Sequence, residues 1–159
     1  INLVLKMNTQ GKIAPNVMII PKSLETTDPH AKDIPNLDGQ LMQLPEPTLV
    51  CISGDSTRVL RGMTATMMLI KPVIYIDIAN TEDISYQYSI LVERGYKMYW
   101  YSCPGFNLNN FKEKQLNITA DSFYMNILAI HEDVDIHDGG IDLPRIDGPN
   151  DNWKRFNND

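Results

Sequence analysis

Two aspartates stand directly behind apolar, β-rich segments of the sequence. Asp77 ends the run VIYID, and Asp55 comes after residues 49–53 and Gly54. In sheets of parallel strands, ligands bind beyond the carboxyl ends of the strands, which is where both carboxylates fall. Each also has a structural alternative. Asp55 can cap the helix that follows it, and Asp77 can simply be a buried acid with a polar partner, because an unpaired buried carboxylate is unfavourable.

Aromatic residues that could line a substrate pocket gather between residues 96 and 106. The group comprises Tyr96, Tyr99, Trp100, Tyr101 and Phe106. Because side chains alternate along a strand, the alternative is that every second member packs into the core. Because ligands bind beyond the carboxyl ends of the strands, three segments are candidates for a site: residues 53–55, 77–80 and 102–110.

The elements that would position these residues follow from the apolar pattern. Five segments predict strands, over residues 17–20, 49–52, 73–78, 98–101 and 124–130. Helical spacing predicts helices over residues 56–70 and 81–95, the first ended by Pro72 and the second by Gly95 as a left-handed cap. Strands that alternate with helices predict an α/β domain with a largely parallel sheet, and right-handed crossovers predict helices on both faces.

One domain is expected over residues 1–130, with a long proline-rich loop over residues 22–47. Residues 131–159 are rich in Asp, Asn and Gly and predict a solvated, acidic tail. His131 and His137 stand among acids there, but nothing fixes their geometry, so we expect no metal site. Because the chain begins with Ile1 rather than Met, we expect a fragment of a longer protein.

Composition narrows the possible partners and the compartment. The chain has 159 residues, a formal net charge of −6 and a sequence pI of about 5.0. Such a chain would repel a phosphate backbone, so we expect no nucleic-acid binding. No apolar run approaches the roughly 20 residues of a membrane-spanning helix, and no signal peptide opens the chain. Two cysteines are too few for a disulfide framework, so we expect a cytoplasmic location.

A series of motifs along the chain matches the pattern of one enzyme family. Within residues 48–79 the matching residues are Val59, Leu60, Arg61, Gly62, Pro72, Val73, Tyr75 and Asp77. Upstream, the pattern matches Asn16-Val17 and residues 34–41. Downstream, it matches Gly95-Tyr96, Tyr99-Trp100, Pro104, Phe106-Asn107, Asn110-Phe111, Asn117-Ile118 and Asn126-Ile127-Leu128. The chain thus resembles the FkbM-type methyltransferases over residues 1–130, in order, which is more specific than any single motif.

The resemblance implies a Rossmann-like class I methyltransferase fold, with a mostly parallel sheet and an antiparallel last strand. It implies S-adenosylmethionine as cofactor, and a sugar hydroxyl or a similar small molecule as acceptor. In such a reaction a deprotonated hydroxyl attacks the methyl group in line, so catalysis needs positioning and a base. The implied roles are Asp77 and then Asp55 as base or acceptor anchor, Ser53 and Gly54 as cofactor contacts, and Trp100, Tyr101, Asn107 and Asn110 as acceptor contacts.

Two departures from the family pattern define an alternative function. The match begins at the family's third strand, without a Gly-rich cofactor loop, so we expect an N-terminally incomplete sheet with a gap after this strand. Three acids of the family's fourth strand are replaced by Cys51, Ser53 and Ser56. The alternative is a non-catalytic relative that binds a glycan or a partner protein. An unrelated nucleotide-binding module ranks last, because no glycine loop is present to cradle a phosphate.

Overall fold

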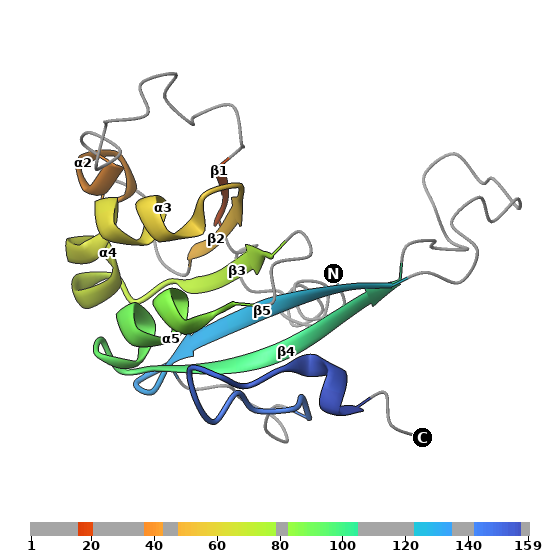
Figure 1. The fold of residues 1–159 in the computed structure, drawn as a ribbon. Coiled ribbons are helices and arrows are strands. Elements are labelled where there is room, and N and C mark those ends of the chain that lie inside the picture. Colours follow the sequence, from red (N-terminus) through yellow and green to blue (C-terminus); the bar gives the residue numbers. More distant parts are fainter. Residues whose placement is uncertain are drawn as a thin grey trace, which may run out of the picture.

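The structure, a computed structural model, describes residues 16–20, 37–42, 48–78, 83–104, 123–134 and 142–156. Its helices and strands alternate along the chain (Figure 1). In order they are β1 (Asn16–Ile20), α2 (Leu37–Leu41), β2 (Thr48–Ser53), α3 (Ser56–Gly62), α4 (Thr64–Leu69), β3 (Val73–Asp77), α5 (Ser85–Val92), β4 (Tyr96–Pro104), β5 (Phe123–His131) and the 3-10 helix η2 (Trp153–Phe156). The α/β class predicted from the sequence is confirmed.

The five strands form one mixed sheet in the order β1-β2-β3-β5-β4. The neighbours β1, β2 and β3 are parallel, whereas β5 is antiparallel to both β3 and β4. Half of the pairings are therefore antiparallel, and the sheet is less parallel than predicted, because β5 lies between β3 and β4. The gap expected beside the first strand is wrong, since β1 pairs directly with β2 from Asn16↔Thr48 to Ile20↔Ile52.

The helices α2, α3, α4 and α5 form one layer, on one face of the sheet (Figure 1). Within it, α2 packs on α3 and α4, and α3 packs on α5. Among the described residues, the helices expected on the second face of the sheet are not found, and the reason is topological. The chain moves from β1 to β2, to β3 and then to β4 in one direction across the sheet. Right-handed crossovers that never reverse direction place every helix on the same side.

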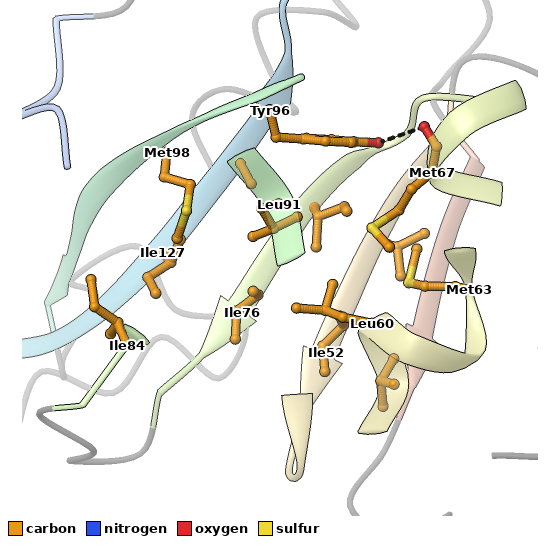
Figure 2. Packing of buried hydrophobic residues seen from close by; sticks show 14 of the residues in the cluster. Ile52, Leu60, Met63, Met67, Ile76, Ile84, Leu91, Tyr96, Met98 and Ile127 are labelled. Atoms are coloured by element: carbon orange, nitrogen blue, oxygen red, sulfur yellow. Dashed lines mark hydrogen bonds between the residues drawn. The ribbon is translucent and has the colours of Figure 1, made fainter. Parts of the chain in front are cut away.

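The apolar core lies between this helix layer and the sheet. Figure 2 shows Ile52 and Ile76 of the sheet packed with Leu60 and Leu91 of the helices. At the edge of the same cluster, the Tyr96 hydroxyl donates to the Met67 carbonyl at 3.4 Å. No helix among the described residues is long and apolar enough to cross a membrane.

The single helix predicted over residues 56–70 is two helices, α3 and α4, with Met63 between them. The reason lies upstream in the chain. The Asp38 carboxylate accepts the backbone N–H groups of Ala65, at 3.0 Å, and of Thr66, at 2.7 Å. It also accepts the Thr66 hydroxyl at 2.7 Å. Asp38 therefore satisfies the first turn of α4 from outside, as an N-cap side chain does in ordinary helices.

The predicted polar tail is described at residues 131–134 and 142–156, and His131 is a buried residue of β5 rather than part of a solvated tail. Residues 142–156, which we call the C-terminal segment, are packed against the domain. The backbone N–H of Trp100 donates to the Pro144 carbonyl at 2.8 Å, and the backbone N–H of Ile146 donates to the Met98 carbonyl at 2.9 Å. Ile146 is 2% exposed and belongs to the core cluster. The polar composition of the tail conceals Ile146, an apolar residue that a solvated tail would leave in water.

Candidate functional site

Four polar side chains lie in a line across the sheet at the carboxyl ends of β2 and β3. The strand registers place Ser53 opposite Asp77, Asp77 opposite Asn126, and Asn126 opposite Tyr101. Residues opposite one another share a face, and neighbouring strands lie about 4.8 Å apart. These four residues, which we call the polar row, thus form a line on the face away from the helices.

The adjacent residues of the same four strands form a second line on the other face: they precede the polar row in β2, β3 and β4 and follow it in the antiparallel β5. Ile52, Ile76, Ile127 and Trp100 are opposite one another in the same registers, and all four are buried. We call them the apolar row. Because the side-chain period of a strand is two, the polar and apolar rows point to opposite sides of the sheet.

Asp77 is the carboxylate of the polar row and is half-buried. The Ser53 hydroxyl donates to Asp77 Oδ2 at 3.5 Å, which is long for an O–H···O bond. Both residues end parallel strands, so the sheet itself brings them together. A carboxylate held in this way can accept a hydrogen bond, or a proton, from a hydroxyl group of a ligand.

Tyr75 and Tyr101 lie on the same face as Asp77. Their ring centroids are 6.0 Å apart with an angle of 77° between the planes, an edge-to-face contact. Burial raises the pKa of Tyr75, and the nearby Cys103 and Asp77 raise it further. Burial also raises the pKa of Tyr101, with a smaller effect from Cys103. Both phenols therefore stay protonated at neutral pH and can donate hydrogen bonds, and Asp77 is the carboxylate of the row.

Asn126 completes the polar row and was not singled out as a site residue from the sequence. Its side chain is 2% exposed, and its amide donates to the Tyr124 carbonyl at 3.4 Å. The signal for it was present, since Asn126 is the one polar residue in the apolar run YMNILAI. A buried amide in a central strand needs partners, which makes such a residue a candidate for a site.

The turn after β2 holds the other acid predicted for the site. Gly54 has a φ of 120°, a conformation that side chains disfavour, so a glycine is needed between β2 and α3. Asp55 Oδ1 accepts the Arg58 N–H at 3.1 Å, and Asp55 is the N-cap of α3. Asp55 therefore has the helix-capping role that was the structural alternative for it. It lies at the same carboxyl edge of the sheet as Asp77.

Trp100 does not fit the stacking role predicted for it. Its side chain is 2% exposed and belongs to the core cluster, so neither face of the ring is open to a sugar. Tyr101, the next residue, lies on the opposite face of the sheet within the polar row. Alternation along β4 separates the two aromatic residues that were expected to act together. Asn107 and Asn110 lie outside the described residues.

The three neutral residues at the acidic positions of the family have different surroundings. Ser53 binds Asp77, as described above. Ser56 is buried and accepts the Gln87 side-chain N–H at 2.9 Å. Cys51 is half-buried, and burial raises the pKa of its thiol, which therefore stays protonated and weakly nucleophilic at neutral pH.

Within the part of the chain that the structure describes, no three His, Cys, Asp or Glu side chains are grouped so that they could hold a metal ion. His131 is buried, and its Nδ1 accepts the Asp133 N–H at 3.1 Å. No family model, curated protein or solved structure matches the chain. The inference of function therefore depends on the polar row and on the sequence motifs.

Proposed function

We propose that the protein is an S-adenosylmethionine-dependent O-methyltransferase of the FkbM type, and that the polar row holds the acceptor hydroxyl. The observation that carries this proposal is the position of Asp77. It ends a central parallel strand, in register with Ser53 and Asn126 on one face of the sheet. The motif resemblance over residues 1–130 supports the proposal from the sequence. The antiparallel β5 between β3 and β4 supports a Rossmann-like methyltransferase sheet with an antiparallel last strand.

Asp77 has the central chemical role in this proposal. Its carboxylate would accept a hydrogen bond from the acceptor hydroxyl and take its proton. The Ser53 hydroxyl lies 3.5 Å from Oδ2 of Asp77, so the two side chains are presented together at the same strand ends. Tyr101 offers a protonated hydroxyl and a ring face at the far end of the row. The bound cofactor supplies an electrophilic methyl group.

Ser53 and Gly54 are the described residues best suited to contact the cofactor. Gly54 has no side chain over the turn that follows β2, so a ligand can approach the backbone there. Ser53 adds a hydroxyl at the same strand end. The acceptor is a sugar hydroxyl, or a hydroxyl of a similar small molecule.

A second candidate, non-catalytic binding of a glycan or a partner protein, is favoured by one specific observation. The direct pairing of β1 with β2 leaves no place between them for strands that would carry a Gly-rich cofactor loop. The neutral side chains of Cys51, Ser53 and Ser56 agree with this candidate. In that case the polar row binds hydroxyl groups without reacting.

The experiment that separates the two candidates is thermal unfolding of the full chain with S-adenosylhomocysteine. A ligand that binds only the folded state raises the melting temperature, so the enzyme predicts a saturable increase and the non-catalytic relative predicts none. Methyl transfer from labelled S-adenosylmethionine to a panel of monosaccharides and glycosides then tests the base. We expect Asp77→Asn to lower turnover at least about tenfold.

The matched control for this substitution is Asp133→Asn. Asp133 lies just beyond β5, at the end of the sheet away from Asp77, and is bound to Lys71. This variant should keep its turnover at a temperature where it is folded. Unchanged turnover in Asp77→Asn would remove Asp77 from the mechanism, and equal losses in both variants would show a general effect on the fold.

A further inference from the structure

The outer edge of β4 is paired with the C-terminal segment. The two backbone hydrogen bonds, from Trp100 to Pro144 and from Ile146 to Met98, enclose an antiparallel bridge between Tyr99 and Arg145. An edge strand otherwise presents a row of open N–H and C=O groups to other chains. Here Pro144 and Ile146 of the same chain make two hydrogen bonds to the middle of that row.

One apolar side chain anchors this pairing. Ile146 is buried in the cluster that contains Met98 and Trp100, whereas Pro144 and Arg145 are exposed. Other contacts of the segment lie beyond the edge itself. The Tyr88 hydroxyl donates to the Asp147 carbonyl at 3.1 Å, and Arg155 donates to the Arg145 carbonyl at 2.8 Å. Trp153 meets Phe123 edge to face, with 6.0 Å between ring centroids.

The two edges of β4 are held very differently. On its inner edge, every residue from Tyr96 to Pro104 is in register with β5. On its outer edge, Tyr99 is the one β4 residue that forms a bridge to another described residue. A short main-chain pairing with one side chain in an apolar site is how extended peptides add to the edge of a sheet. The C-terminal segment therefore occupies a peptide site in its own domain.

We propose that the outer edge of β4 is a binding surface for an extended segment, and that the C-terminal segment of a second copy of this chain can replace the chain's own. The occupant follows from complementarity. Residues 144–146 of another copy can make the same contacts with this edge that the chain's own residues 144–146 make. This is domain swapping, the exchange of an identical element between protomers. This inference goes beyond the proposed methyl transfer and does not depend on it.

The test uses a fluorescein-labelled peptide of residues 142–156 and the full chain, with fluorescence polarisation as the readout. We expect saturable binding that the unlabelled peptide reverses. A peptide with Ile146→Asp should bind at least tenfold more weakly, because it lacks the apolar anchor. A peptide with Gly148→Ala is the matched control and should bind as the natural peptide does, since a Cβ at Gly148 meets nothing within 4 Å.

A substitution that weakens the binding of the chain's own C-terminal segment gives a second test. In the full chain the tethered segment competes with the peptide, so only the fraction of molecules with an open edge binds. The full chain with Ile146→Asp should therefore bind the natural peptide at least tenfold more tightly than the unsubstituted chain. If this variant does not fold, the unsubstituted chain alone decides.

Two results would overturn the inference. One is the absence of saturable peptide binding by the unsubstituted chain, and the other is equal binding of the natural and Ile146→Asp peptides. Light scattering over a range of chain concentrations should then show dimers of the unsubstituted chain, which an excess of the peptide dissociates. Dimers that the peptide leaves intact would exclude the segment as their link. None of these readouts involves cofactor, so they are distinct from a failure of the proposed function.

Discussion

The polar and apolar rows are one residue apart on the same four strands, yet their surroundings are opposite. Ile52, Ile76, Ile127 and Trp100 face the helix layer and are buried in the core. Ser53, Asp77, Asn126 and Tyr101 face away from the helices, and only Asn126 among them is buried. The difference shows how a sheet with helices on one face can separate stability from chemistry. One row holds the fold together, and the next carries polar side chains.

This comparison makes opposite predictions for neighbouring residues. Substitutions in the apolar row should destabilise the chain because they remove buried volume. Substitutions of the half-buried members of the polar row, Ser53, Asp77 and Tyr101, should change ligand binding or turnover with less effect on the free energy of unfolding.

The largest effect is expected for Trp100→Ala. The indole is buried, so its loss leaves a cavity and should lower the free energy of unfolding by about 3–5 kcal/mol. Tyr101→Ala is the matched control on the opposite face, where the half-buried ring has an edge-to-face contact with Tyr75, and it should cost about 1 kcal/mol. Urea denaturation measures both. Equal losses would contradict the assignment of the two residues to different faces.

Gly95→Ala tests the turn before β4. This turn determines which side chains of β4 point toward the helices and which point away from them. Gly95 has a φ of 79°, and a Cβ there would lie 2.9 Å from His131 Nε2. Backbone strain and the contact with the buried imidazole together should cost about 2–4 kcal/mol. A slip of one residue to relieve the contact would move every side chain of β4 to the other face.

The control for that variant is Gly148→Ala, where a Cβ has open space around it. Its free energy of unfolding should change by no more than about 0.5 kcal/mol in urea denaturation. A loss that is equally small for Gly95→Ala would show that the turn before β4 tolerates a side chain.

The smallest effect is expected for Asp133→Asn, at the end of the sheet away from the polar row. The side-chain hydrogen bond from Lys71 lowers the pKa of Asp133, and the charges of Lys71 and His131 lower it further. A carboxyl group with a lowered folded-state pKa stabilises the fold above its ordinary pKa of 3.8, and this contribution is lost as pH falls through the lower, folded-state pKa.

The difference in unfolding free energy between the natural chain and Asp133→Asn should therefore be present at neutral pH and should shrink in acid. Because the Asp133 side chain is exposed, added salt should shrink it as well. Urea denaturation at several pH values measures this difference. A difference that is the same in acid and at neutral pH would show that the ion pair does not contribute to stability.

Local features of the fold could be predicted from the sequence. The spacing of apolar residues indicated the strands and α5, and Gly95 was correctly expected to have the left-handed conformation. Asp55 was one of two candidates for the cap of α3, and it is the N-cap. These features depend on residues close together in the chain, where spacing and turn chemistry are informative.

Features that depend on distant parts of the chain could not be predicted in this way. The break at Met63 depends on Asp38, which is far from α4 in sequence. The insertion of β5 between β3 and β4, and the pairing of Ile146 with Met98, are also long-range. For the site, spacing identified Asp77, but it could not decide which of Trp100 and Tyr101 faces the helices.

The most direct test of the central claim is a titration of the isotope-labelled chain with S-adenosylhomocysteine, followed by amide NMR. We expect saturable shifts at Gly54 and at Ser53, Asp77 and Asn126 of the polar row, with little change at His131 and Asp133. Saturable shifts confined to the His131 end of the sheet, or no shifts at any concentration, would contradict the assignment of the carboxyl edge as the site of an S-adenosylmethionine-dependent enzyme.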